Sequence, residues 1–483
     1  MPSVLSHMGI MLGTLLILWS GVTAAFGLYL QSKCARYLDR GVSSFFALSQ
    51  ITYPNAAVVF DMAIAVKCFG VGVSYMIIIG DLMPGVVLGF NSGADQVPYL
   101  VDRHFWITAF MLLVIPLSFL RRLDSLKYTS LISLVSIGYL IVLVIYHFAH
   151  DPHADPSQIR VIEWASAVET LSALPVVVFA YTCHQNMFSI LNEIQDNSPS
   201  SVVGVVGSSI GLAAVIYIVV SITGYMTFGN AVVANIISMY PTGVASTIGK
   251  AAIVVLVLFS IPLQVHPCRA SLDAVSKWRP TSRNAPGNGV AGGRNSPLLS
   301  GPAISRGGGA GGGGDHPSGV GMSDVRFAVL TTIILTLAYM TALSVSSLDR
   351  MLAFVGSTGS TSISFILPGL FYYKISDPDS IHHQRLVKED DDIDDAIAGG
   401  GAGDTDDEDQ PGVLAQSTGS LRSVGSDIGG GGAAPWQWRR KWRWDLEHLD
   451  QGLIRKLALA LAIYGMVVMS VCLIMNLFFT TAH

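Results

Sequence analysis

Charged residues and catalytic motifs are scarce in this sequence. Asp, Glu, Lys and Arg make up only 13% of the 483 residues, whereas a soluble protein carries roughly a quarter. The five cysteines do not pair at metal-ligand spacing, which argues against a zinc site and against a disulfide framework. No H-E-x-x-H, P-loop or G-x-S-x-G motif occurs. We therefore expect a protein that is not an enzyme, with no metal and no cofactor.

Apolar residues are abundant instead. They make up 51% of the chain, and the mean hydropathy is +0.53. Runs of about 20 apolar residues recur, and a helix of that length crosses the hydrocarbon core of a bilayer. The sequence predicts ten spans, at about residues 8–30, 61–83, 104–120, 128–149, 168–190, 204–228, 244–265, 326–346, 350–373 and 453–478. The expected fold class is an all-α polytopic membrane protein that lies in a lipid bilayer.

Basic residues favour one side of the predicted spans. If the spans alternate in direction, 23 of the 28 Lys and Arg residues fall on the side of the loops that follow odd-numbered spans. The other five are Lys67, Arg103, Arg160, Lys250 and Arg350. Because Lys and Arg mark the cytosolic side, we expect these loops in the cytosol and both chain ends on the opposite side.

Two long segments have compositions typical of unpacked chain. Residues 279–324 are rich in Gly, Ser and Pro, and residues 375–452 begin with an acidic, Gly-rich run. Both predict disordered cytosolic loops, and the second is the candidate segment for a cytosolic regulatory partner. It ends in "PWQWRRKWRW", which we interpret as a juxtamembrane anchor rather than a nucleic-acid-binding motif. The expected organisation is seven spans in residues 1–278, a loop in 279–324, two spans in 325–374, a loop in 375–452 and the last span in 453–483.

Six polar side chains interrupt the fifth predicted span. The stretch "VVVFAYTCHQNMF" runs from apolar residues directly into Tyr181–Asn186. On a helical wheel most of these polar residues share one arc, but His184 falls on the apolar side. Either His184 bonds a neighbouring helix, or the backbone unwinds here, where Pro175 has already weakened the helix. Unwound backbone at membrane depth is tolerated only where it is buried in protein or lines a cavity.

Other spans carry isolated polar residues. In the second span, Ser74 and Tyr75 stand among glycines, which more often permit close helix packing than form a site. In the same span, Lys67 either reaches an interface or pairs with Asp61. In the seventh span, Ser260 stands beside a proline, an arrangement that suits either a cation site or a simple kink.

Three blocks carry a resemblance to a known family. "KCFGVGVSYMIIIGDLMP", "VVFAYTCHQNMFSILNEI" and "GSTGSTSISFILPGLFYY" occur in this order and resemble the amino acid/auxin permease family, above all its fungal vacuolar amino acid transporters and its system N/A-like transporters. The likeness runs from Met8 to Phe479, apart from the two low-complexity loops. It implies a fold similar to that of the bacterial leucine transporter, with two inverted five-helix repeats and eleven spans. About ten are found here, as family spans two to eleven, and an incomplete gene model is favoured over a truncation.

The resemblance also implies a site and a function. It places a helix break in "FAYTCHQN" and an amino acid against it. The implied substrate-binding residues are Phe179, Ala180, Tyr181, Thr182, Cys183, His184 and Asn186, with Ser74 and Tyr75 facing them. The candidates for proton or ion coupling are His184, Glu193 and Ser260, since an unperturbed histidine titrates near neutral pH.

The implied function is secondary active transport of an amino acid, coupled to protons rather than to sodium. The implied location is a vacuolar or lysosome-like membrane rather than the plasma membrane. The alternative is a truncated, non-transporting amino acid sensor or scaffold that acts through its cytosolic loops.

Overall fold

The computed structural model describes residues 1–38, 41, 43–120, 127–196, 198–277, 322–380, 382–384 and 451–479. Two compact units are distinguished: Met1–Ile375 with Lys456–His483, and Ser376–Arg455. Most of the loop predicted at 279–324 and most of the loop predicted at 375–452, with its Trp- and Arg-rich anchor, lie outside the described residues. Both therefore stay predictions. In the second unit, Arg455 forms an ion pair with Asp377 at 2.9 Å.

Each of the ten predicted spans corresponds to helical structure. The helices are α2 (Ile10–Ala35), α4 (Ala57–Phe90), α6 (Arg103–Ser118), α7 (Lys127–His150), α8 (Ala167–Ala180) with α9 (Met187–Glu193), α10 (Pro199–Phe228), α12 (Val244–Lys277), α13 (Asp324–Ser344), α14 (Leu348–Val355) with α15 (Leu367–Ile375), and α17 (Gln451–Ile474). Among the described residues, nine of these segments are long and apolar enough to cross a membrane, and α6 is shorter. No strand occurs in this part of the chain. The prediction of an all-α polytopic membrane protein is confirmed.

Short helices link or extend the spans. They are α1 (Pro2–Met8), α3 (Phe45–Thr52), η1 (Ser92–Gln96), α5 (Pro98–Val101), η3 (Pro156–Gln158), η4 (His184–Asn186), η5 (Gly229–Ala231), α11 (Ile236–Met239), η6 (Gly356–Ser360), η7 (Ser362–Ile366) and η10 (Met475–Phe479). No helix was predicted before the first span. Residues Pro2–Met8 nevertheless form α1, which packs against α10 and α8. A turn at Gly9, with φ of 74°, then leads into α2, a backbone conformation that glycine adopts at little cost.

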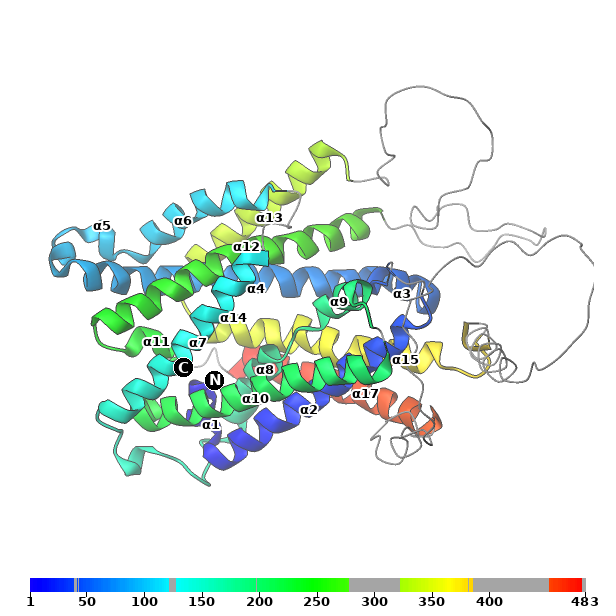
Figure 1. Cartoon of the computed structure of the whole chain (residues 1–483), viewed down its shortest axis with the longest axis horizontal. Helices are drawn as coiled ribbons and strands as arrows, with labels where there is room; N and C mark the ends of the chain where they lie inside the picture. Colours follow the sequence, from blue (N-terminus) through cyan, green and yellow to red (C-terminus); the bar gives the residue numbers. More distant parts are fainter. Residues whose placement is uncertain are drawn as a thin grey trace, which may run out of the picture. The chain divides into compact units, whose positions relative to one another are not determined.

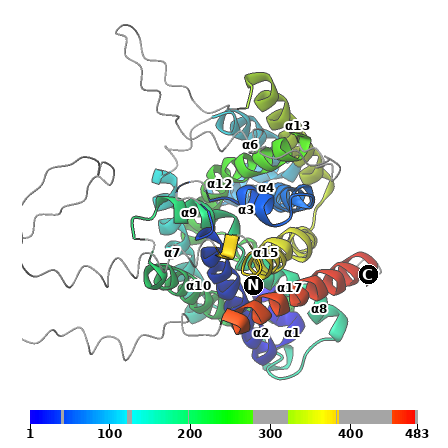
Figure 2. The same cartoon turned by 90° about the vertical axis from the view of Figure 1, so that its right-hand side faces the viewer.

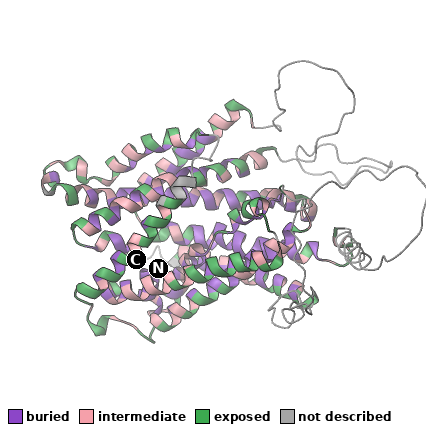
Figure 3. Cartoon of the chain, in the orientation of Figure 1, coloured by how far each residue is buried: buried purple, intermediate pink, exposed green. Residues whose placement is uncertain are grey.

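The spans divide into inner and outer ones. α4 packs most extensively against α12, and the two helices run side by side in both views (Figures 1 and 2). In Leu348–Ile375, 78% of the most apolar window of the span is buried inside the protein, whereas in Pro199–Ala231 the share is only 17%. The burial colouring shows the same contrast (Figure 3). Because outer helices have apolar surfaces that lipid covers, polar residues on the inner helices are the ones that point to function.

Two arginines, the partly buried Arg103 and the buried Arg269, join helices. Arg103 forms an ion pair with Asp81 at 3.1 Å and donates to the Val345 carbonyl at 2.9 Å, which ties α6 to α4 and to the end of α13. Arg269 donates to the Thr331 hydroxyl at 2.8 Å. These side chains have protein partners, as a charge at membrane depth requires.

His147 joins α7 to α12. Its Nδ1 lies 2.7 Å from the Asp151 carboxylate, and its Nε2 lies 3.1 Å from the Ser246 hydroxyl. The ring stacks on Tyr240 with 4.1 Å between centroids. Ser246 is only 2% exposed, so this Asp–His–Ser arrangement is closed to any substrate. It serves as a structural tie between two spans.

We expect His147→Ala to destabilise the protein. The substitution leaves the buried Ser246 hydroxyl without its partner and removes a charge-assisted hydrogen bond, so the free energy of unfolding should fall by about 2 kcal/mol. Thermal unfolding of the detergent-purified protein, followed by size-exclusion elution, measures the change. His150→Ala is the matched control, because His150 is exposed and its ring bonds and stacks on Tyr146 of its own helix. Equal melting temperatures for the two variants would contradict the assigned tie.

Candidate functional site

The fifth predicted span is broken in the middle. α8 ends at Ala180, residues Tyr181–Cys183 are not helical, η4 forms one tight turn, and α9 resumes at Met187. The unwinding interpretation is therefore confirmed, and the helical wheel does not apply beyond Ala180. The break leaves backbone groups free of the helical ladder at a depth where lipid offers them no partner.

Side chains satisfy the carbonyl groups that the break leaves free. The Tyr217 hydroxyl of α10 donates to the Ala180 carbonyl at 2.8 Å, and the Thr182 hydroxyl donates to the Val178 carbonyl at 2.9 Å. Thr182 in turn accepts from the Ser364 hydroxyl at 3.3 Å. A helix end without such partners costs free energy when it is buried. The two hydroxyl donors therefore fix the point at which α8 ends.

His184 turns away from the span axis and bonds a neighbouring helix. It is fully buried, and its Nε2 lies 3.1 Å from the Ala24 carbonyl of α2. Since a carbonyl only accepts, Nε2 carries the hydrogen. In the neutral ring Nδ1 is then an acceptor, and it has no hydrogen-bond partner among the described residues. Both interpretations of His184 thus hold together: the backbone unwinds, and the side chain bonds α2.

A close approach at Gly27 makes room for His184. A Cβ at Gly27 would lie 2.8 Å from His184 Nε2 and nearer still to the Ser364 carbonyl oxygen. No larger residue fits there unless its neighbours shift. Glycine at this position thus lets α2, the break and η7 meet at one point.

A cavity of about 370 Å³ lies beside the break. Its lining residues come from the start of α1 and from α4, α8, the break with η4, α10, α12 and α14. They are Met1, Lys67, Val71, Tyr75, Val176, Phe179, Ala180, Thr182, Gln185, Tyr217, Gln264 and Leu352. The volume falls within the range of about 300–1,000 Å³ that is typical of small-molecule sites.

Four of the predicted substrate-binding residues line this cavity: Tyr75, Phe179, Ala180 and Thr182. The other five are not among the lining residues. Ser74 donates to the Gly70 carbonyl at 2.9 Å, Tyr181 packs edge-on against Tyr217 with 5.2 Å between ring centroids, and His184 bonds α2 as described. Cys183 and Asn186 are exposed.

The two other coupling candidates also lie outside the cavity lining. Glu193 is exposed at the end of α9. The Ser260 hydroxyl donates to the Leu256 carbonyl of its own helix at 2.7 Å. Neither geometry tests a coupling role, so the roles of His184, Glu193 and Ser260 stay predictions.

Sequence reasoning missed much of the polar part of the lining. Lys67, Gln185, Tyr217 and Gln264 all line the cavity. Gln185 belongs to the run "FAYTCHQN" that was expected to line the site, whereas Lys67, Tyr217 and Gln264 were not assigned to it. A signal for Lys67 was present, because Lys67 lies eight residues before Tyr75 and residues spaced by four share one face of a helix. Nothing comparable was present for Tyr217 or Gln264, which only tertiary packing brings to the break.

The cavity presents hydrogen-bonding groups that have no protein partner. The side-chain oxygens of Gln185 and Gln264 are buried without a hydrogen-bond donor among the described residues. The expected pairing of Lys67 with Asp61 is wrong, since the described residues contain no such ion pair and the two positions lie on different faces of α4. The described lining thus includes the cation of Lys67 and two neutral acceptors, and Met1, which carries the N-terminal amino group, also belongs to it.

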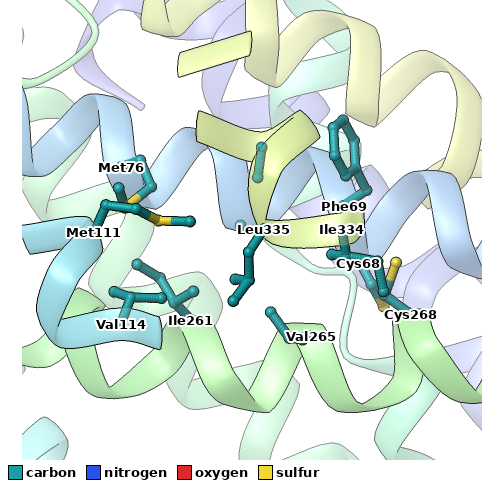
Figure 4. Close-up of a pocket in the computed structure, with 12 residues that line it drawn as sticks. Cys68, Phe69, Met76, Met111, Val114, Ile261, Val265, Cys268, Ile334 and Leu335 are labelled. Atoms are coloured by element: carbon teal, nitrogen blue, oxygen red, sulfur yellow. The ribbon is translucent and has the colours of Figure 1, made fainter. Parts of the chain in front are cut away.

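A second, smaller space lies between α4, α6, α12 and α13 (Figure 4). Aliphatic, aromatic and sulfur-containing side chains line it, including Cys68, Met111 and Ile334, and its volume is about 10 Å³. A water needs at least about 10–15 Å³ and several polar partners. This space is therefore a packing void, and the cavity beside the break is the candidate site.

Known proteins are similar in sequence to this chain. The profile of the family described as "Transmembrane amino acid transporter protein" matches residues 1–391. Vacuolar amino acid transporter 6 of Saccharomyces cerevisiae is 40% identical over 401 residues, which cover 78% of this chain and 86% of the yeast protein. This chain is a member of the transmembrane amino acid transporter family.

Other members of the family are similar over different extents. Vacuolar amino acid transporter 5 of Schizosaccharomyces pombe is 43% identical over 379 residues, or 78% of this chain and 80% of the relative. Sodium-coupled neutral amino acid transporter 7 of Mus musculus is 31% identical over 215 residues, or 43% of this chain and 46% of the relative. The resemblance to fungal vacuolar transporters and to system N/A-like transporters is confirmed.

We expect Gly27→Ala to destabilise the site. The added methyl group overlaps His184 and the Ser364 carbonyl, and overpacking of this kind costs about 1–3 kcal/mol. Melting of the purified protein measures the loss. Gly211→Ala in α10 is the matched control, because nothing lies within 4 Å of a Cβ built there. A Gly27→Ala variant as stable as the control would show that the close approach is not required.

Proposed function

We propose that this protein transports amino acids and that the cavity beside the break is its substrate site. One observation carries this: the cavity combines a cation, two unpartnered acceptors and an unwound span within one small volume. Broken helices hold substrates in this way in transporters with inverted repeats. We extend the proposal to that fold, with the α8–α9 segment as one broken helix.

We further propose a vacuolar location and proton coupling. The support is the likeness to two fungal relatives that are named vacuolar amino acid transporters. The mouse relative is named as sodium-coupled, but it matches less than half of this chain. The proposal therefore follows the fungal relatives, which match over 78% of the chain.

Replacing Gln185 tests the cavity as the substrate site. Gln185→Leu keeps the approximate size of the side chain but removes the unpartnered oxygen, so the KM for amino acid uptake should rise roughly tenfold. Uptake of labelled amino acids into proteoliposomes measures it. Gln96→Leu is the matched control, since Gln96 is an exposed amide in η1. An unchanged KM in the Gln185 variant would remove this residue from the substrate site.

An imposed pH gradient tests proton coupling. Proteoliposomes with a pH difference across the membrane should accumulate labelled amino acid, and a protonophore should abolish the accumulation. Replacing sodium with choline should leave uptake unchanged. Uptake that needs sodium, or that does not respond to the protonophore, would refute the coupling proposal.

His184→Gln keeps an N–H donor for the Ala24 carbonyl but cannot titrate, so a flatter pH profile in this variant is the result expected of a coupling residue.

A further inference from the structure

We propose that Lys67 is the group that binds the carboxylate of the substrate. The inference rests on the proposed function, because it assigns a role within the same cavity. It starts from the placement of Lys67, which is 3% exposed and yet lines the cavity. Its ammonium therefore has little contact with bulk solvent, and the cavity is the space that it faces.

The α4 helix presents a single stripe to the cavity. Lys67, Val71 and Tyr75 are the three α4 residues in the lining, and each follows the last by four positions. Such residues lie one above the other on the same helix face. A substrate against this stripe meets a cation at one end and a phenol at the other, with an apolar side chain between them.

Lys67 is not used to join helices, in contrast to another buried lysine in the bundle. Lys250 is 4% exposed and donates to the Tyr240 carbonyl at 3.0 Å. No hydrogen bond or ion pair joins Lys67 to another residue in the part of the chain that the structure describes. A buried ammonium is costly unless it is paired. A bound carboxylate supplies the missing partner.

The opposite end of a zwitterion also finds partners in this cavity. An α-ammonium group only donates hydrogen bonds, and the unpartnered oxygens of Gln185 and Gln264 only accept them. No Asp or Glu is among the described lining residues. The cavity therefore combines the cation of Lys67 with neutral acceptors, which matches a carboxylate and an ammonium on the same small molecule.

Close packing fixes the position of Lys67. A Cβ at Gly359 of η6 would lie 2.5 Å from Lys67 Cβ and 2.8 Å from Lys67 Cα. The α4 backbone at Lys67 thus rests directly against η6. A cation held on a fixed backbone loses less freedom when it binds, which favours a specific partner.

The charge of the lining also predicts selectivity. A substrate with a cationic side chain brings a second positive charge near Lys67 and finds no carboxylate to pair with. We therefore expect neutral amino acids to bind more tightly than lysine or arginine. This preference depends on Lys67 and should weaken when its charge is removed.

Competition binding to the full chain tests the assignment. The labelled probe is whichever of the twenty amino acids the purified protein binds most tightly, and the competitors are the same amino acid unlabelled and its carboxamide. The carboxamide keeps the ammonium and the side chain but lacks the negative charge. We expect the wild type to prefer the carboxylate form by roughly 10- to 100-fold, the range typical of a charge-assisted hydrogen bond.

Variants of Lys67 then identify the cation responsible. Lys67→Met, which keeps the length of the side chain, should reduce the preference to less than about threefold, whereas Lys67→Arg should retain most of it. A purely structural role for Lys67 would weaken both ligands equally and leave their ratio unchanged. Lys250→Met is the matched control, a buried lysine outside the cavity, and its ratio should equal that of the wild type.

The outcomes separate the two proposals. If Lys67→Met keeps the wild-type ratio, or if the wild type itself does not prefer the carboxylate, the role of Lys67 is refuted while the cavity stays the substrate site. If the wild type binds none of the twenty amino acids, the proposed function itself fails. The wild-type comparison needs no variant, so the absence of a carboxylate preference refutes the role even if Lys67→Met does not elute as a folded protein. If a preference is found, Lys67→Gln then takes the place of Lys67→Met.

Discussion

The structure of the site depends on one constraint, which is that free backbone carbonyls cannot face lipid. The break after Ala180 produces such groups in the middle of a span, and the hydroxyls of Tyr217 and Thr182 satisfy two of them. Tyr217 lies on α10, so the break depends on a side chain that reaches it from another span. The same tyrosine lines the cavity. Tyr217 thus both stabilises the unwound backbone and lines the cavity beside it.

Close packing transmits this constraint to the neighbouring helices. At Gly27, α2 approaches His184 and Ser364, and at Gly359, η6 approaches the backbone of Lys67. At both contacts a small residue permits close approach of neighbouring elements. Packing and site are not alternatives here, because the close contact is what holds a polar side chain at the edge of the cavity.

The sequence predicted the membrane spans and the break well, because each has a local cause. A span is a run of apolar residues, and the break lies where six polar side chains follow Pro175. The lining of the cavity was predicted only in part, because it depends on which helices become neighbours. Tyr75 and Thr182 were found, while Tyr217 and Gln264 carry no local mark of their role. His184 was also predicted to bind the substrate; its side chain bonds α2 and is not among the lining residues, and its role in binding stays a prediction.

The charge of the cavity bears on how transport is driven. Protonated Lys67 gives the site one positive charge, and a zwitterion adds none. When only the amino acid is bound, the empty and the loaded site carry the same net charge. The membrane potential therefore favours neither of them. A coupled proton adds one charge, which is worth about 2.3 kcal/mol per 100 mV. No Asp or Glu is among the described lining residues, so the lining offers no carboxylate for that proton. The titratable coupling candidates His184 and Glu193 lie outside the lining, and their coupling roles stay predictions.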